Sequence, residues 1–191
     1  GIACHAGVSP TRIEARGAER VLHLSDGATQ VFDAVFFCTG RKPATAGLGL
    51  DKAGVKLAEN GVIAVDENHA TSQPHIYAIG DVLDRVNLTP MATAIGHALA
   101  DTLFGNNPRR VSYENVPTAV FMNPPIGTVG ITEEEAAKRG PADIYVTRFT
   151  PMRHTISKRE GRKTLMKLVV CQRTQKILGA HMIGEDAGEM M

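Results

Sequence analysis

Residues 75–104, which read HIYAIGDVLDRVNLTPMATAIGHALADTLF, decide the fold that the sequence predicts. Residues 76–79 form a short apolar run with β-branched and aromatic members, which indicates a buried strand. Gly80 permits a sharp turn where that strand ends, and Asp81 presents a carboxylate directly after it. Thr89 suits the N-cap of a following helix, and the proline after it suits the first helical turn, where no backbone N–H is needed.

The helix expected from Thr89 onward has one apolar face at helical spacing, made of Met91, Ala94, Ile95, Ala98, Leu99 and Leu103. Its first turn carries unpaired N–H groups, which attract negative charge. The carboxylate of Asp81, just before it, accepts hydrogen bonds from hydroxyl groups. These features predict a ligand site, and an ordinary strand-to-helix connection is the alternative that the residues leave open.

The composition suits a globular chain of one or two domains. It has 191 residues, 43% of them hydrophobic and 21% charged, with a formal net charge of +1. This charge gives no reason to expect a nucleic acid or an anionic membrane as partner, and no apolar run approaches the ~20 residues of a membrane span. Cys4, Cys38 and Cys171 are too far apart to indicate a zinc site or a disulfide framework. We therefore expect no metal and a reducing, cytoplasmic location.

Both ends of the chain read as the interior of a longer protein. The chain begins at Gly1 without an initiating methionine, and it ends at Met191 within what reads as the start of a helix. We therefore expect an internal fragment, and an organellar parent stays open because a targeting segment would precede it.

The first forty residues predict a small antiparallel sheet followed by a buried strand. Short strands are expected at 13–15 and 21–24, with a turn at 25–27. The apolar run 34–38 reads as a fully buried strand. The loop 39–43 after it, with its glycine and proline, is a usual place for a ligand to meet an α/β sheet, and a plain strand exit is the alternative.

The region after the helix predicts an α+β domain built on an antiparallel sheet. Gly105 and the Asn-Asn-Pro after it end the helix and mark a domain boundary. Thr132 and Glu135 have the spacing of a capping box, which predicts a helix over 132–140. Strands are expected at 118–121, 126–130, 144–147, 165–170 and 177–183.

Five motifs resemble, in order and spacing, those of the flavin-dependent pyridine-nucleotide disulfide oxidoreductase family. They are TGRKP at 39–43, IYAIGD at 76–81, LTP at 88–90, NPPIGTVG at 123–130 and FTPM at 149–152. The resemblance implies a fold that combines α/β and α+β parts. Residues 1–43 would end an NAD(P)-binding domain, 44–112 would be the second segment of an FAD-binding domain, and 113–191 would form most of an antiparallel-sheet dimerisation domain, truncated at its C-terminus.

Two motifs favour the glutathione reductase branch of this family. The sequence has LTPM at 88–91 and PPI at 124–126, where lipoamide dehydrogenases usually have M-L-A-H and D-P-E. A dihydrolipoamide dehydrogenase-like enzyme, or another disulfide reductase such as a trypanothione or mercuric reductase, is the alternative within the family.

The resemblance also implies which residues meet the cofactors. Asp81 corresponds to the family's aspartate on the ribityl hydroxyls of FAD, and Thr89 lies where the family's backbone N–H meets the flavin pyrimidine edge. Leu88, just before it, is also implied to bind FAD. A helix start there suits the negative charge of reduced flavin. For NADPH, the corresponding positions are Gly40, Asn87 and Ala119.

Three positions are implied for the disulfide substrate. His97 stands where the family commonly has an arginine that binds a glutathione carboxylate. A histidine lacks the bidentate guanidinium fork and is largely neutral at pH 7, so glutathione would be held differently or the substrate differs. A polar residue on the exposed helix face is the alternative for His97. Phe149 and Met152 lie where the dimerisation domain lines the substrate site, and packing is their alternative role.

The resemblance implies electron flow from NADPH through FAD to a cysteine pair and then to glutathione disulfide, in a homodimer. The cysteine pair, the nucleotide-binding GxGxxG motifs and the acid–base His-Glu pair have no counterpart in this sequence. We therefore expect no catalytic residue in it and no reductase activity from the 191 residues alone. A non-enzymatic dimerisation or binding module is the rival from another class.

Overall fold

The computed structural model describes residues 2–156 and 163–191. The chain divides into two compact units, Gly1–Arg41 and Lys42–Met191. Lys158, Arg159 and Arg162, whose basic sequence is typical of a solvated loop, lie outside the described residues. Each unit is described by itself.

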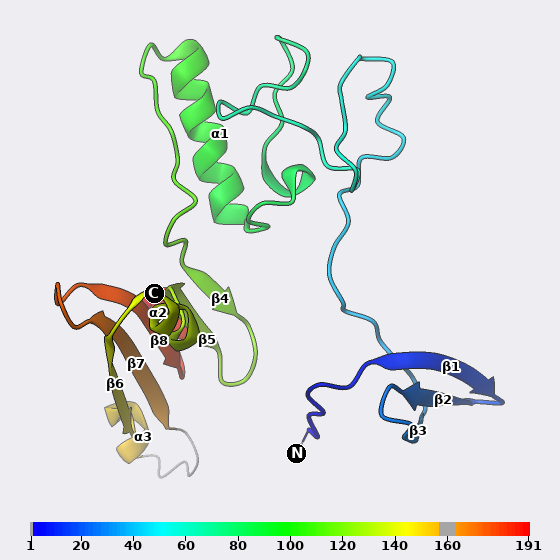
Figure 1. Cartoon of the computed structure of the whole chain (residues 1–191), viewed down its shortest axis with the longest axis vertical. Coiled ribbons are helices and arrows are strands. Elements are labelled where there is room, and N and C mark those ends of the chain that lie inside the picture. The colour runs from blue at the N-terminus through cyan, green and yellow to red at the C-terminus, as the bar shows by residue number, and fades with distance from the viewer. Residues whose placement is uncertain (1, 157–162) are drawn as a thin grey trace. The chain divides into compact units, whose positions relative to one another are not determined.

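The first unit is a three-stranded antiparallel sheet (Figure 1). Its strands are β1 (Pro10–Arg16), β2 (Glu19–Leu24) and β3 (Thr29–Phe32), in the order β1-β2-β3. The predicted turn at 25–27 joins β2 to β3, and the Asp26 carboxylate accepts a hydrogen bond of 2.9 Å from the Ala28 N–H. The small antiparallel sheet that the sequence predicts is therefore present.

The prediction of a buried strand at 34–38 is wrong. Residues 34–40 adopt no regular structure, and Phe36 and Phe37 are 88% and 58% exposed. An apolar run indicates that a strand would be buried, but it does not supply the neighbouring strands that the hydrogen bonds need. Among the described residues, no strand pairs with this run.

The second unit begins with irregular segments that surround a small core. Val55, Ile63, Ala78 and Leu83 are buried together there. The prediction of a strand at 76–79 is wrong, because this run makes only an isolated bridge between Ala70 and Tyr77. The burial of the run was predicted correctly at Ala78, which is 7% exposed, but here too a partner strand is lacking.

A short 3-10 helix and a long α-helix follow, as Figure 1 shows. They are η1 (Gly80–Leu83) and α1 (Thr89–Phe104), and α1 buries Met91, Ile95 and Ala98 from the predicted apolar face. Leu88, rather than Thr89, is the N-cap, because the Ala92 N–H already donates to the Leu88 carbonyl at 3.1 Å. The predicted end is confirmed by Gly105, whose N–H donates to the Asp101 carbonyl.

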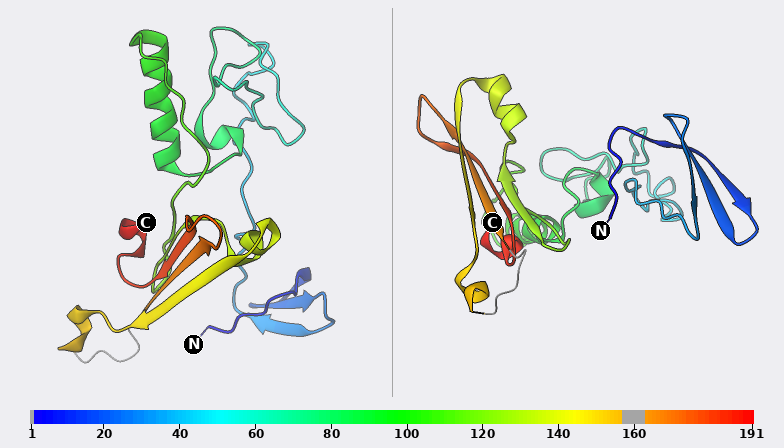
Figure 2. Two further views of the ribbon diagram at one scale, coloured as in Figure 1. Left: turned by 60° about the vertical axis from the view of Figure 1, so that its left-hand side comes forward. Right: turned by 90° about the horizontal axis from the view of Figure 1, so that it is seen from below.

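The rest of the second unit is a five-stranded antiparallel sheet in the order β4-β5-β8-β7-β6. Its strands are β4 (Thr118–Val120), β5 (Ile126–Gly130), β6 (Ala142–Phe149), β7 (Thr164–Cys171) and β8 (Ile177–Ile183). All five strands that the sequence predicts in this region are present. Figure 2 shows β6 running on into the short helix α3 (Met152–Thr155).

Two helices cover parts of this sheet. The helix α2 (Glu133–Arg139) contacts β6 and β7, and α4 (Ala187–Met190) contacts β4 and β5. The predicted capping box of α2 is confirmed, since Thr132 and Glu135 exchange hydrogen bonds of 2.8 Å and 3.2 Å. The Thr132 N–H, which donates to the Glu135 carboxylate, lowers the pKa of that carboxyl.

Candidate functional site

The turn that carries Asp81 lies close to α1. Gly80 has φ +74°, a left-handed conformation that favours glycine, and a Cβ there would lie 3.2 Å from the Ala92 Cβ. Asp81 is the next residue, in the first turn of η1, and its side chain is exposed. The glycine therefore lets the backbone bring a carboxylate beside the start of α1.

The start of α1 is not capped by a side chain. Its N-cap residue is Leu88, which has no hydrogen-bonding side chain, and Pro90 in the first turn has no N–H. Thr89 is exposed at the first helical position. The positive end of the helix dipole is thus available to a ligand with partial negative charge.

A side-chain hydrogen bond closes the loop between η1 and α1. Asn87 Nδ2 donates to Asp84 Oδ1 at 3.0 Å, and Asp84 has φ +47°. The other amide atom, Asn87 Oδ1, is buried and has no hydrogen-bond partner among the described residues. Such an atom is costly to bury unless a ligand or water donates to it.

An apolar hollow of about 380 Å³ opens at the same end of α1. It is lined by three segments that are distant in sequence: the start of α1, the region 116–121 around β4, and α4 with the C-terminal residue. Leu88 and Ala119, which the sequence assigns to FAD and NADPH, meet in this hollow. Its mostly apolar walls suit a planar ring system.

Sequence reasoning missed eight residues that line the hollow: Pro90, Met91, Val116, Pro117, Thr118, Phe121, Gly188 and Met191. Phe121 is 92% exposed, and Gly188 is so close to β4 that a Cβ on it would lie 3.0 Å from the Ala119 Cβ. These contacts join distant segments, so no local pattern could reveal them. The Asp84–Asn87 hydrogen bond, by contrast, had a local signal in its i, i+3 spacing.

The other predicted site residues do not line this hollow. Gly40 belongs to the first unit, where it is exposed with φ +115°. His97 is exposed on α1, and Phe149 and Met152, at the end of β6 and the start of α3, are 41% and 88% exposed. Their roles remain predictions.

Two further observations concern metal ligands and membrane-spanning helices. Within the described ranges 2–156 and 163–191, no group of three or more histidine, cysteine or acidic residues could hold a metal ion. In the same ranges, no helix has the length and apolar character to cross a membrane.

The sequence matches two models that describe parts of one protein family. Residues 1–96 match the model of the pyridine nucleotide-disulphide oxidoreductase family, and residues 116–191 match the dimerisation domain of the same family. The chain therefore belongs to the pyridine nucleotide-disulphide oxidoreductase family, and this confirms the resemblance and the mixed α/β and α+β fold class.

The chain is also similar to individual proteins of this family. The chain is 47% identical to the chloroplastic/mitochondrial glutathione reductase of Pisum sativum, an alignment that covers 100% of this chain and 35% of the relative. It is 49% identical to the glutathione reductase of a Nostoc species, over 84% of this chain and 38% of the relative. A solved copper(II) complex of the HOCl-induced flavoprotein disulfide reductase RclA from Escherichia coli superposes with a TM-score of 0.82 at 33% identity, covering 95% of this chain and 41% of RclA. The chain thus spans well under half the length of these proteins.

The residues around the start of α1 fit a flavin. Asp81 can accept hydroxyl hydrogen bonds, and the uncapped helix start faces an apolar hollow that can take a ring. A flavin dinucleotide has groups that match these features: hydroxyls on its sugar chain, and a planar ring with hydrogen-bonding atoms.

Proposed function

We propose that this chain is part of a flavoprotein disulfide reductase of the glutathione reductase type, which reduces glutathione disulfide with NADPH. The observation that carries the proposal is the arrangement at the start of α1, where Asp81, an uncapped helix end and an apolar hollow occur together. The identity of 47–49% to proteins named glutathione reductase supports it.

The FAD site is proposed at Asp81, Leu88 and Thr89. FAD, when bound, supplies the two-electron transfer between the nicotinamide and a cysteine pair. Asp81 would hold the ribityl hydroxyls, and Leu88 would contact the ring. The N–H groups at Thr89 would face the pyrimidine edge, where a helix start stabilises negative charge by about 0.3–1 kcal/mol.

Gly40, Asn87 and Ala119 are proposed to meet NADPH. The position of Ala119 on the apolar hollow beside Leu88 supports a nicotinamide ring that packs near the flavin. The buried, unsatisfied Asn87 Oδ1 supports a donor there, and a carboxamide is such a donor.

The disulfide substrate is proposed to meet His97, Phe149 and Met152. The exposure of Met152, 88%, leaves an apolar side chain for a ligand or partner to cover. His97 can donate one hydrogen bond to a glutathione carboxylate, where an arginine would donate two.

The chain is also proposed to form a homodimer in the cytoplasm. The outer strand β6 exposes Ile144, Tyr145 and Val146 by 40–55%, and such an apolar edge strand favours association with a second copy.

We propose the boundaries 1–43, 44–112 and 113–191 for the parts of the NAD(P)-binding, FAD-binding and dimerisation domains.

A substrate panel tests the proposed function. The protein, assayed at the length of its relatives, is expected to oxidise NADPH with glutathione disulfide in preference to trypanothione disulfide or lipoamide. The 191 residues alone serve as the blank and are expected to show no turnover, because they hold no cysteine pair of the required kind.

Two outcomes would overturn the proposal. A preference for lipoamide with NAD would assign the chain to a dihydrolipoamide dehydrogenase-like enzyme. No turnover with any disulfide, together with stable dimers, would favour a non-enzymatic binding module.

A further inference from the structure

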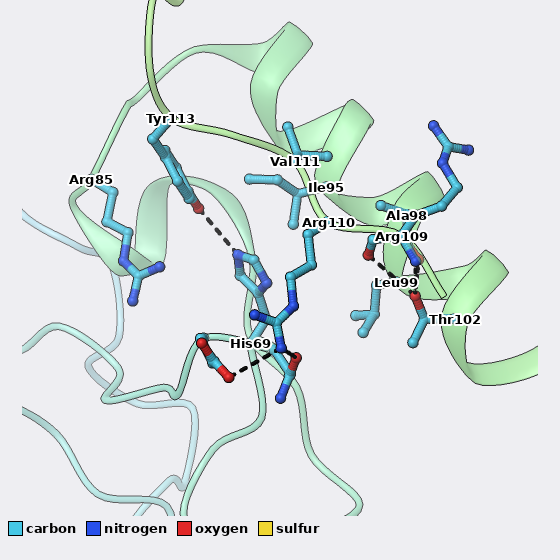
Figure 3. A pocket seen from close by; sticks show the side chains of 12 residues that line it. His69, Arg85, Ile95, Ala98, Leu99, Thr102, Arg109, Arg110, Val111 and Tyr113 are labelled. Atoms are coloured by element: carbon cyan, nitrogen blue, oxygen red, sulfur yellow. Dashed lines mark hydrogen bonds and ion pairs between the residues drawn. The ribbon is translucent and has the colours of Figure 1, made fainter. Parts of the chain in front are cut away.

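A second pocket, at the other end of α1, shares no lining residue with the apolar hollow. It has a volume of about 260 Å³ and lies between α1, the segment 109–113 and the loop around His69 (Figure 3). The space equals that of roughly eight or nine liquid waters, enough for a small acid with one ring. One wall is apolar, formed by Ile95, Ala98, Leu99 and Val111.

Cationic groups surround this pocket, but two of them are already neutralised. Arg110 Nη2 pairs with Glu67 Oε1 at 3.0 Å and also donates to Asn68 Oδ1. Arg109 pairs with Asp101. These two arginines leave little net charge for a ligand.

Arg85 is the cation without such a partner. Among the residues that the structure describes, no carboxylate forms an ion pair with it. Its Cζ lies 5.5 Å from the centroid of the Tyr113 ring, a cation–π contact that restrains the guanidinium at the pocket. The pocket therefore presents one uncompensated positive charge next to an apolar wall.

Polar donors stand beside Arg85. His69 Nε2 and the Tyr113 hydroxyl are 3.1 Å apart, and Figure 3 shows both side chains pointing into the pocket. His69 has φ +64°, a backbone conformation that is uncommon for a residue other than glycine. Whichever group accepts this hydrogen bond keeps a donor for a ligand: the Tyr113 hydroxyl when His69 Nε2–H donates, or His69 Nδ1–H when the hydroxyl donates.

We propose that this pocket binds a small monocarboxylate with an apolar body, whose carboxylate meets Arg85 and whose body packs on the apolar wall of α1. One uncompensated charge matches one carboxylate, and the planar guanidinium suits carboxylate oxygens. The inference does not depend on the proposed reductase function.

The site predicts a dependence on pH through His69. Burial, and then the charge of Arg85, lower the pKa of His69, while Asp66 raises it. The other groups around the ring are Tyr113, Glu67 and Arg110. A bound carboxylate would offset the Arg85 charge and raise the pKa, so a proton is taken up on binding and affinity increases as pH falls.

Calorimetric titration of the whole chain with benzoate tests the proposal, with benzamide as the neutral isostere and inorganic phosphate as the anion without an apolar body. We expect benzoate to bind at least tenfold more tightly than either. Arg85→Gln should weaken benzoate at least tenfold and leave benzamide unchanged. Arg12→Gln, an exposed arginine of β1, is the control and should change neither.

The outcomes are decisive in both directions. Equal binding of benzoate and benzamide, equal or tighter binding of phosphate, an unaffected Arg85→Gln variant, or no heat at roughly 10 mM benzoate would each overturn the proposal. His69→Asn tolerates the left-handed backbone and should retain benzoate binding but lose its pH dependence; a pH dependence that persists would overturn the role of His69.

Discussion

At the scale of single residues, the chemistry of the site divides between groups that act through charge and groups that act through shape. The positions of Asp81 after a glycine turn and of Thr89 at a helix start could be predicted from the sequence alone, because both are local features, while their roles toward a flavin stay predictions. The buried Asn87 Oδ1 could not, because its burial depends on the folded loop. Ala119 could be placed only by resemblance, since its contact with the hollow depends on segments far along the chain.

His97 gives a prediction at this scale. His97→Arg restores a bidentate donor, so the KM for glutathione disulfide should fall roughly three- to tenfold while kcat stays the same. Steady-state kinetics at the length of the relatives measures this. Ala100→Arg adds the same charge one turn further along the exposed side of α1 and is the control. An unchanged KM, or an equal fall for Ala100→Arg, would mean that His97 does not bind a carboxylate.

At the scale of elements, the sequence predicted the helices more accurately than it predicted the strands outside the large sheet. The bonds and caps of a helix come from neighbouring residues, and so Thr132 with Glu135 predicted α2, and Gly105 the end of α1. A strand needs a partner from elsewhere. The runs 34–38 and 76–79 have apolar sequences but no ladder, whereas the strands after residue 112 find one another in a single sheet.

The packing of α4 on β5 gives a prediction at this scale. A Cβ on Gly127 would clash with the Ala187 carbonyl oxygen, and this backbone clash would push α4 and the hollow's Gly188 and Met191 outward. Gly127→Ala should lower the free energy of unfolding by about 3 kcal/mol in urea titrations. It should also weaken ligand binding at the hollow.

Gly140→Ala is the matched control for this substitution. It has open space but φ +141°, so only backbone strain acts and the loss should be about 1–2 kcal/mol. Equal losses for the two variants would contradict the contact between β5 and α4 as the cause.

At the scale of the whole molecule, the chain combines the proposed cofactor site with residues 116–191, which match the family's dimerisation domain, and it spans 35–41% of three similar proteins. The hollow at the start of α1 is made by three separate segments of the second unit. Composition and motifs predict such segments one at a time, and only folding shows which of them meet. That is why the elements could be predicted while the lining of the hollow could not.

The flavin affinity of Asp81→Asn is the measurement that tests the central claim most directly. A carboxylate that accepts hydroxyl hydrogen bonds contributes about 1.5–3 kcal/mol, so the variant, prepared at the length of the relatives, should bind FAD at least tenfold more weakly by fluorescence titration. Asp51→Asn, another exposed aspartate of the second unit, is the control and should bind FAD as the unchanged protein does. Equal FAD affinity for Asp81→Asn and the unchanged protein would contradict a flavin site at the start of α1.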